Sequence, residues 1–391
     1  MIKGQRFLAL DAMRGICAVF VCLFHFHANS AVQGWGLIRG SWQFVDFFFV
    51  LSGFVISYNY EDKLQSGMPA RQFMALRLGR IYPLHIAVLA AFVVMELLVL
   101  IGPLKANREA FDAAHSVSGL VSNILLLRGS SSFGAETWNN PSWSIATEAW
   151  AYVIFASLVI LRVNNFKVLI ALVIGCAALL LYVTAKGTAV TGDFGLLRCI
   201  YGFALGVICA KLWRHLPDFK LSAVLWTVIE FLAIFAVIFF LSTSGETRRT
   251  VLGPLLFAVT VLVFARDGGY INRGLSTRLP VYLGALSYSI YMVHVFVQER
   301  MANVLNILAK KTKYDFMDGS NPLRPPLIGE TVLQGTVLTV VMLLSVIAVS
   351  MLTYKFIELP GQAWTRRALA KYYPPKKPAA TPELAAEQPQ A

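Results

Sequence analysis

The chain has 391 residues, of which 57% are hydrophobic and 14% are charged, and its formal net charge is +13. Soluble domains carry charged residues at about a quarter of their positions, so this composition excludes an ordinary soluble domain and predicts a protein embedded in a bilayer. The positive charge does not indicate nucleic acid as a partner, because the basic residues lie in short segments between long apolar runs. Basic residues in such positions typically set the orientation of membrane helices.

The five cysteines all lie inside apolar stretches, without the spacing of metal ligands and without the even count of a disulfide framework. We therefore predict neither disulfides nor a metal site. The N-terminus resembles a signal peptide, because Lys3 and Arg6 precede an apolar run, but Asp11 and Arg14 interrupt that run. We expect it to be the first retained helix.

Ten apolar stretches are long enough to cross a hydrocarbon core of roughly 30 Å as helices. They lie at 8–28, 43–60, 80–103, 143–162, 167–185, 195–213, 221–241, 250–266, 281–300 and 332–356. A shorter apolar piece at 117–128 is expected to be re-entrant or interfacial, and the alternative count is eleven spans. The predicted fold is all-α, a polytopic membrane bundle of about ten transmembrane helices.

Residues 1–370 are predicted to form this transmembrane domain, and 371–391 a disordered tail rich in proline and alanine. Because lysine and arginine are retained inside, the charge distribution predicts both termini in the cytoplasm. With no further soluble domain expected, chemistry has to use the helices and short loops, of which the longest, 104–142 and 301–331, are predicted on the outer side.

The first helix carries ionisable groups at membrane depth, where such groups are costly unless they are paired or face water. Arg14 and His25 are eleven positions apart, so at about 100° per residue they share a face, separated by roughly 16 Å of helix rise. His27 points to the other side. The alternative is that Asp11 holds Arg14 and that His25 lies in the outer interface, hydrated by water.

The fourth span places Ser144, Glu148 and Tyr152 on one stripe at i, i+4 and i+8. A buried carboxylate needs a partner, and Glu148 and His25 are both predicted toward the outer side, so the carboxylate could orient that histidine. The alternative is an ion pair between Glu148 and a helix-packing arginine.

Two further helices carry polar groups. Ser287, Tyr291 and His294 fall on one face of the ninth span, a pattern more often typical of interhelix hydrogen bonds than of catalysis. In the second span, Ser52 and Gly53 form a small pair that allows close backbone approach. Ser52 lacks the G-x-S-x-G elbow and is a poor candidate nucleophile.

Arg77 and Arg80 are one turn apart where the third helix is predicted to enter from the cytoplasm. Such a pair can hold phosphate groups. The alternative is that both arginines serve only the positive-inside rule.

These segments together resemble the acyltransferase-3 family. LDAMRG followed by His25 is similar to the family's signature of an arginine, ten residues and a histidine, and FFFVLSGFVIS follows it. RLGRIYPLH resembles the family's R-x-x-R element, NNPSWSIATEAWAY its tryptophan, serine and glutamate element, and LGALSYSIYMVHVFV its late-helix motif, with YKFIELPGQ near the end. The likeness spans nearly the whole chain.

The resemblance implies an O-acyltransferase of the bacterial inner membrane that moves an acyl group, usually acetyl, from cytoplasmic coenzyme A to a hydroxyl. The implied acceptor is a surface polysaccharide, a lipopolysaccharide or a related glycan. Acyl-CoA is then a substrate, and no permanently bound cofactor is expected. The resemblance places Arg14 and His25 in the essential pair, Glu148 in the acidic position, and Arg77 with Arg80 in the cytoplasmic arginine motif. We therefore predict His25, Arg14 and Glu148 as catalytic residues and Arg77 and Arg80 as acyl-CoA ligands. From their positions in the sequence, the candidates for substrate contact or support are Asp11, Ser52, Ser144, Tyr291 and His294.

Imidazole is the side chain best matched to remove a proton from a hydroxyl near neutral pH, which favours His25 as the base. Both direct transfer and an acyl-histidine intermediate are consistent with this role. A transporter of a glycan or an anionic lipid-linked substrate is the main alternative, because it would use the same buried ionisable groups. Only the acyltransferase consumes a thioester, and the sequence carries no signal for an oligomeric state.

Overall fold

The computed structural model describes residues 6–102, 108–129, 137–217, 219–312, 314–318 and 327–373. Its α-helices are α1 (Leu8–His25), α2 (Gly36–Gly40), α3 (Phe44–Gln65), α4 (Ala70–Ile101), α5 (Val117–Ile124), α6 (Ser142–Ile160), α7 (Phe166–Val183), α8 (Gly195–His215), α9 (Ala223–Ser244), α10 (Gly253–Phe264), α11 (Tyr270–Leu275), α12 (Arg278–Thr312), α13 (Val332–Thr353) and α14 (Leu359–Tyr372). The two strands in the described ranges, β1 (Met317–Asp318) and β2 (Leu327–Ile328), pair antiparallel, with Met317 opposite Ile328. The prediction of an all-α bundle is confirmed.

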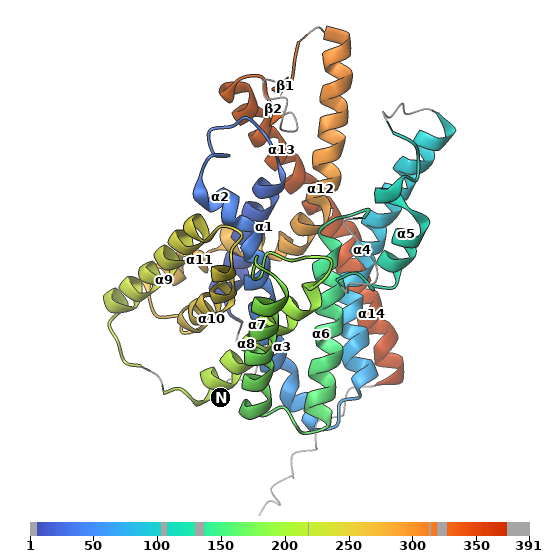
Figure 1. The fold of residues 1–391 in the computed structure, drawn as a ribbon. Coiled ribbons are helices and arrows are strands. Elements are labelled where there is room, and N and C mark those ends of the chain that lie inside the picture. Colours follow the sequence, from blue (N-terminus) through green and yellow to red (C-terminus); the bar gives the residue numbers. More distant parts are fainter. Residues whose placement is uncertain are drawn as a thin grey trace, which may run out of the picture.

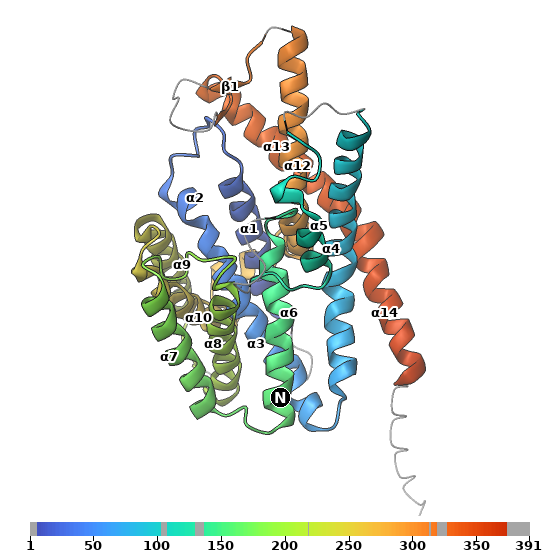
Figure 2. The same cartoon turned by 45° about the vertical axis from the view of Figure 1, so that its right-hand side comes forward.

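The helices α1, α3 and α12 form the centre of the bundle, with α7 to α10 on one flank and α4, α5 and α14 on the other (Figures 1 and 2). Along their lengths, α1 packs against α12 and α3 against α8. We call the end at which α3 ends and α4 begins the lower end, as it is drawn in Figure 1. The central helices hold the site described below.

The first and last helices reach the same end of the bundle. Phe7, just before α1, packs against Tyr58 near the end of α3, at 5.1 Å between ring centroids. Arg71, at the start of α4, lies over the ring of Tyr373, just after α14, at 5.5 Å. Both contacts lie at the lower end, in keeping with the prediction of both termini on one side; that this side is the cytoplasm stays a prediction.

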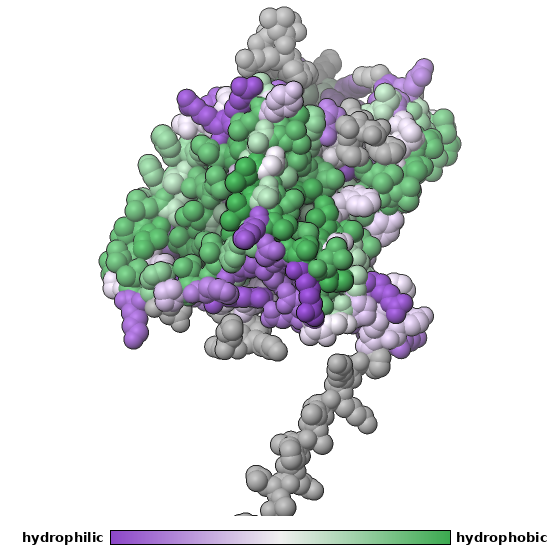
Figure 3. Space-filling model, turned by 60° about the horizontal axis from the view of Figure 1, so that its bottom comes forward, coloured by the Kyte–Doolittle hydropathy of each residue, from purple (hydrophilic) through white to green (hydrophobic). Residues whose placement is uncertain are grey.

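The flanks of the bundle are apolar, as expected of a surface that faces lipid. On α9 the rings of Phe231, Phe235 and Phe239 stack in a row and are 58%, 56% and 61% exposed. Figure 3 shows a broad apolar surface on the sides of the molecule and hydrophilic residues gathered toward its lower end. A soluble protein rarely exposes so large and continuous an apolar surface to water. The chain is a multi-pass membrane protein.

Among the described residues, nine helical segments are long and apolar enough to cross a bilayer. The predicted span at 250–266 differs from these, because it consists of a 3₁₀ helix, Arg248–Leu252, followed by the 12-residue α10, which rises about 18 Å. Glu230, near the start of α9, accepts a hydrogen bond of 2.9 Å from the backbone N–H of Gly269, just after α10. The segment that contains α10 therefore runs back along α9. The prediction of a full-length helix at 250–266 is wrong.

Several predicted boundaries are also wrong, because long helices continue past their apolar parts. α4 begins ten residues before the predicted 80, and α12 continues to Thr312, so part of the predicted loop 301–331 is helical. The last span passes through a π-helical turn, Tyr354–Glu358, into α14. Hydropathy detects only the apolar part of a helix, whereas polar turns such as those at Lys310 and Lys311 extend it toward water. Of the predicted disordered tail, 374–391 lies outside the described residues.

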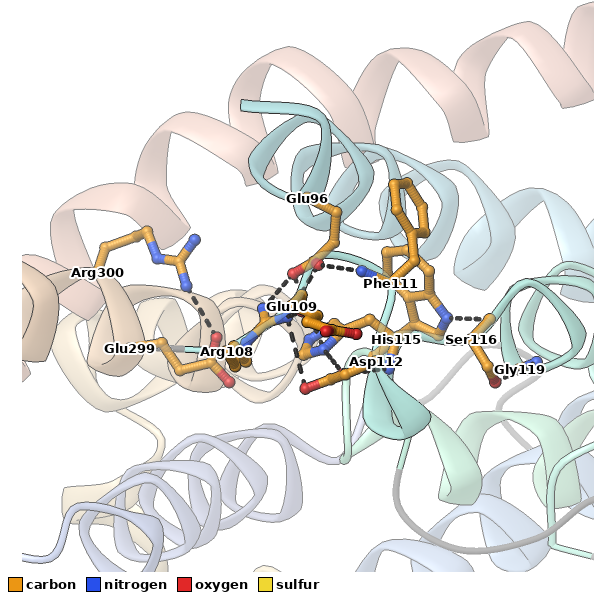
Figure 4. Close-up of polar contacts among 11 residues, drawn as sticks. Glu96, Arg108, Glu109, Phe111, Asp112, His115, Ser116, Gly119, Glu299 and Arg300 are labelled. Carbon is orange, nitrogen blue, oxygen red and sulfur yellow. Dashed lines mark hydrogen bonds and ion pairs between the residues drawn. The ribbon is translucent and has the colours of Figure 1, made fainter. Parts of the chain in front are cut away.

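A second polar cluster holds the loop that follows α4 against the bundle. Glu96 on α4 accepts hydrogen bonds from the Arg108 guanidinium and from the backbone N–H of Phe111 at 3.0 Å (Figure 4). Asp112 accepts from the His115 ring nitrogen Nδ1 at 3.0 Å and lies 3.5 Å from Arg108. We call these four charged or titratable side chains, Glu96, Arg108, Asp112 and His115, the Glu96 cluster. It fixes the loop that leads to α5 and α6.

Candidate active site

A cavity of about 110 Å³ lies inside the bundle, between α1, α3, α4, α6 and α12. Nine residues singled out from the sequence line it: Arg14, Ser52, Arg77, Arg80, Ser144, Glu148, Tyr152, Ser287 and Tyr291. The other lining residues are Val45, Phe48, Phe49, Leu51, Val55, Ile56, Ile81, Ile145 and Tyr288. We call this space the arginine cavity. The structure thus brings together residues that lie far apart in the sequence.

Arg14 is positioned by the crossing of α1 and α12. The two helices touch at Gly15 and Gly284, where a Cβ on Gly15 would lie 2.5 Å from the Gly284 nitrogen. This close approach lets Arg14 donate from Nε to Ser287 Oγ at 2.7 Å and from Nη2 to the Gly284 carbonyl at 3.1 Å. Asp11 lies 4.0 Å from Arg14, so the expected ion pair is present but is secondary, and Asp11 does not line the cavity.

Glu148 is held by hydroxyl groups instead of by a charge. Its Oε1 atom accepts from Ser52 Oγ at 2.5 Å and from Tyr152 OH at 2.6 Å. Neither sequence alternative is realised, since Glu148 bonds neither to His25 nor, within 4.0 Å, to an arginine of the described chain. Two hydroxyl groups occupy the positions next to Oε1 instead: that of Tyr152, one turn along α6, and that of Ser52, across the helix interface. Its Oε2 atom makes no hydrogen bond to any described residue and can accept one from a ligand.

The small pair on α3 behaves as the sequence predicts. A Cβ on Gly53 would lie 2.1 Å from the Phe203 carbonyl oxygen, and one on Gly206 would lie 2.0 Å from the Val50 carbonyl oxygen, so glycine at these positions allows α3 and α8 to approach closely. The neighbouring Ser52 consequently faces the cavity, where it serves Glu148 as a hydrogen-bond donor.

The two arginines on α4 line the cavity, and neither forms an ion pair with a carboxylate of the described chain. The Arg77 guanidinium lies over the rings of Tyr60, at 5.1 Å, and Tyr152, at 6.0 Å. Its buried Nε has no hydrogen-bond partner among the described residues. Arg80 likewise forms no hydrogen bond or ion pair within 4.0 Å to the part of the chain that the structure describes. Aromatic faces stabilise a guanidinium while leaving its edge available.

His25 lies beyond the cavity and pairs with a second histidine. Its Nδ1 is 2.9 Å from the Val21 carbonyl and 3.3 Å from His294 Nε2, and His294 Nδ1 is 2.7 Å from the Tyr291 carbonyl. A carbonyl oxygen only accepts, so Nδ1 of His25 is the donor and Nε2 is the nitrogen that carries the lone pair in the neutral ring. This tautomer is the one that a general base on Nε2 requires.

Tyr291 separates the arginine cavity from the histidine pair. Its hydroxyl lies 2.8 Å from Ser144 Oγ and donates to the Pro141 carbonyl at 3.2 Å, while His294 follows one turn later on α12. The polar residues on this face of α12, Ser287, Tyr291 and His294, thus make interhelix hydrogen bonds, as expected from their pattern in the sequence. Each of the three side chains nevertheless makes one bond to a predicted site residue: Ser287 bonds to Arg14, Tyr291 to Ser144 and His294 to His25.

Two residues near the cavity were not selected from the sequence. Tyr288 lines the cavity, and its hydroxyl donates to the Ile81 carbonyl. Glu358, 3% exposed, accepts from Ser289 Oγ at 3.0 Å behind the cavity wall. The signal for Glu358 was available in YKFIELPGQ, because a carboxylate directly after an apolar run is costly unless it has a partner.

Comparison with known proteins agrees with this geometry. The model of the acyltransferase domain family Acyl_transf_3 matches residues 7–355. The chain is 32% identical over 161 residues to "Protein 2 in picA locus" of Rhizobium radiobacter, covering 39% of this chain and 82% of that protein. It is 25% identical to "Peptidoglycan O-acetyltransferase OatA" of Listeria monocytogenes serovar 1/2a, covering 76% of this chain and 50% of that protein. No solved structure matches.

The family match extends over all the helices that line the arginine cavity. It confirms the predicted family and the predicted enzyme class, a membrane-embedded O-acetyltransferase. The roles of the individual residues stay predictions. On the evidence of the matched range and of the bundle that carries it, the chain belongs to the acyltransferase-3 family.

Proposed function

We propose that this protein moves an acetyl group from acetyl-CoA to a hydroxyl of a bacterial surface carbohydrate. The observation that carries the proposal is the arginine cavity, in which three guanidinium groups face one carboxylate inside a membrane bundle. Such an excess of buried positive charge is costly unless an anionic ligand occupies the site for part of the catalytic cycle. The name of the Listeria relative supports acetyl as the group and a glycan hydroxyl as the acceptor.

The donor would enter from the lower end of the bundle. Arg77 and Arg80 are suited to its phosphate groups, because guanidinium edges bind phosphate through two parallel hydrogen bonds. Arg14, held deeper in the cavity by Ser287, is suited to the thioester carbonyl, where negative charge develops during attack. Oε2 of Glu148 can accept from an amide N–H of the pantetheine arm.

His25 is proposed as the general base. Its Nε2 takes the proton from the acceptor hydroxyl while the hydroxyl oxygen bonds to the thioester carbonyl carbon. The tetrahedral intermediate then collapses, the carbon–sulfur bond breaks, and coenzyme A leaves as the thiolate. The thioester end of the donor has to pass Tyr291 to reach the histidine pair. In this proposal the donor binds in the arginine cavity and the acceptor hydroxyl binds at His25.

The test uses membrane vesicles that contain the full chain, supplied with acetyl-labelled coenzyme A thioester. Alkali-labile label on envelope glycan is measured for the wild type, for His25→Ala and for the control His27→Ala. His27 is an exposed neighbour, and the one hydrogen bond in which it is described uses its backbone carbonyl. We expect His25→Ala to lose transfer at normal abundance and His27→Ala to retain it.

Full transfer by His25→Ala would overturn the assignment of the base. The absence of any thioester consumption by the wild type, combined with movement of a glycan precursor across the vesicle, would overturn the enzymatic proposal in favour of transport. Consumption of the thioester without labelled glycan would contradict the choice of acceptor.

A further inference from the structure

The histidine pair between α1 and α12 is a chain of hydrogen bonds with one direction. His294 Nδ1 lies 2.7 Å from the Tyr291 carbonyl and 3.2 Å from the Ile290 carbonyl. His25 Nδ1 lies 2.9 Å from the Val21 carbonyl and 3.3 Å from His294 Nε2. Carbonyl oxygens only accept, so both Nδ1 atoms carry a hydrogen. The chain therefore runs from His25 Nδ1–H to His294 Nε2, and from His294 Nδ1–H to backbone carbonyls of α12.

No other arrangement of protons fits these contacts. If His294 Nε2 also carried a hydrogen, that hydrogen would point at the one on His25 Nδ1. If His294 Nδ1 lost its hydrogen, its lone pair would face two carbonyl oxygens. His294 is therefore a neutral ring that accepts at Nε2. Because both of its nitrogens are occupied by these contacts and its side chain is fully buried, it is not placed to take a proton from an acceptor hydroxyl itself.

The neighbouring helix supports His25 at a point where its own helix ends. His25 is the last residue of α1, so no further helical turn holds it. On α12, hydrogen bonds to α1 lie on both sides of His294: Ser287 Oγ accepts from Arg14 at 2.7 Å, and Gln298 Nε2 donates to the Cys22 carbonyl at 2.8 Å. These bonds fix the position of α12 along α1, and with it the position of the His294 ring next to His25.

We propose that His294 is a positioning residue for the general base: by accepting the Nδ1–H of His25, it keeps the lone pair of that ring on Nε2 and stabilises the charge that the ring gains. During transfer the proton of the acceptor hydroxyl goes to His25 Nε2, and Nδ1 keeps its hydrogen. The bond to His294 then becomes charge-assisted and stronger. A base oriented by a third group is a recurring arrangement, in which a neutral imidazole here takes the place of a carboxylate.

The two acceptors of the His25 Nδ1–H have different roles. The Val21 carbonyl belongs to α1 and moves with His25. His294 belongs to α12, which also carries Ser287 and Tyr291 in the wall of the arginine cavity. The contact with His294 thus ties the base to the helix that lines the donor site. The inference rests on the proposed function, because it requires His25 to act as the base.

The experiment compares His294→Leu and His294→Gln with the wild type in the vesicle assay. It measures kcat and KM for acetyl-CoA separately and refers kcat to the amount of folded protein, determined by size-exclusion chromatography in detergent. Leucine removes the acceptor, whereas glutamine supplies a side-chain oxygen that can accept from the Nδ1–H. We expect His294→Leu to lower kcat roughly 10- to 100-fold, as loss of the hydrogen-bond partner of a functional histidine does in metal enzymes, with KM within about threefold. His294→Gln should recover a large part of kcat.

The matched control is His85→Leu. His85 is also a buried histidine within a helix, 2% exposed, and its Nε2 lies 2.9 Å from the Asn123 carbonyl, but it does not line the arginine cavity. Its variant loses a buried imidazole and a hydrogen bond to a carbonyl, as His294→Leu does. We expect kcat per folded protein and KM to stay close to the wild-type values even where less protein folds.

An unchanged kcat per folded protein in His294→Leu would overturn the inference, and His294 would then have a structural role only. A kcat in His294→Gln no higher than in His294→Leu would overturn the role of the hydrogen bond. A loss in both variants as complete as that in His25→Ala would also overturn the inference, because His294 would then act as a base itself. A wild type that consumes no acetyl-CoA would instead contradict the proposed function, so the two failures are distinguishable.

Discussion

Two buried polar clusters in this bundle differ in how their charges are paired. In the Glu96 cluster, the carboxylate meets a guanidinium and a backbone N–H, and Asp112 meets both Arg108 and His115. In the arginine cavity, the charged groups meet aromatic faces and hydroxyls, and the Nε of Arg77 is left without a partner among the described residues. A cluster that satisfies its own charges holds a loop in place, whereas one that leaves cations unpaired is prepared for a ligand.

The largest expected effect concerns an unpaired cation. Arg77→Gln should lower kcat/KM for acetyl-CoA on the order of 100-fold, since hydrogen bonds between charged groups contribute about 1.5–3 kcal/mol each. Thermal stability in detergent should change little, because the substitution removes a buried donor that has no described partner but also loses the contacts of the guanidinium with Tyr60 and Tyr152. Initial rates against acetyl-CoA concentration and a melting curve of the same sample measure the two effects.

The matched control for that experiment is Arg71→Gln. Arg71 is an exposed arginine at the start of the same helix, and it does not line the cavity. Its variant should keep nearly normal kinetics. If both variants lost activity to the same degree, Arg77 would serve only the positive-inside rule.

A smaller effect on stability is expected from the Glu96 cluster. Glu96→Gln weakens the bond to Arg108, which is itself 36% exposed, so we expect a local loss of about 1–2 kcal/mol. Hydrogen exchange in 108–117 should become faster, while KM for acetyl-CoA stays unchanged. Glu109→Gln is the control, because Arg108 meets the backbone carbonyl of Glu109 rather than its carboxylate. A changed KM for acetyl-CoA in Glu96→Gln would show that the Glu96 cluster is coupled to the arginine cavity. It would contradict the view that this cluster only holds a loop in place.

The same contrast explains how much the sequence could predict. The cavity residues were predictable because charged or polar side chains at membrane depth are rare and stand out against leucine and phenylalanine, as Arg14 and Glu148 do. The partners of these residues were not predictable. Helix periodicity gives the direction of a side chain within its own helix, but whether Glu148 meets His25 or Ser52 depends on how helices cross, here at Gly15 with Gly284 and at Gly53.

Helix ends and short helices were the weaker part of the prediction. The apolar stretch 250–266 predicted a full-length span, but only Gly253–Phe264 is α-helical, because hydropathy does not distinguish an α-helix from the 3₁₀ turn that precedes α10. By contrast, α12 and α14 extend through polar sequence that hydropathy assigns to loops. The Glu96 cluster was also missed, because His115 and Asp112 stand in a loop where ionisable residues are ordinary. Their significance comes from the carboxylate buried on α4: His115 Nδ1 lies 3.8 Å from Glu96, and Asp112 lies 3.5 Å from Arg108, which donates to Glu96.

The smallest expected effect is a dependence on pH at the Glu96 cluster. Burial opposes ionisation of Asp112, but the hydrogen bond from His115 and the charge of Arg108 outweigh it and lower the pKa of the Asp112 carboxyl. A carboxyl whose pKa is lower in the folded state stabilises the fold above its unfolded pKa, about 3.9, and loses that contribution as the pH falls through the folded value. Hydrogen exchange of 108–117 should therefore be constant from neutral pH to about pH 4 and should show reduced protection below it, after correction for the intrinsic exchange rate. Asp112→Asn should show this reduced protection at all pH values. If the wild-type loop instead lost protection as the pH was raised, Asp112 would not be stabilised as the anion, and the Glu96 cluster would not satisfy its own charges.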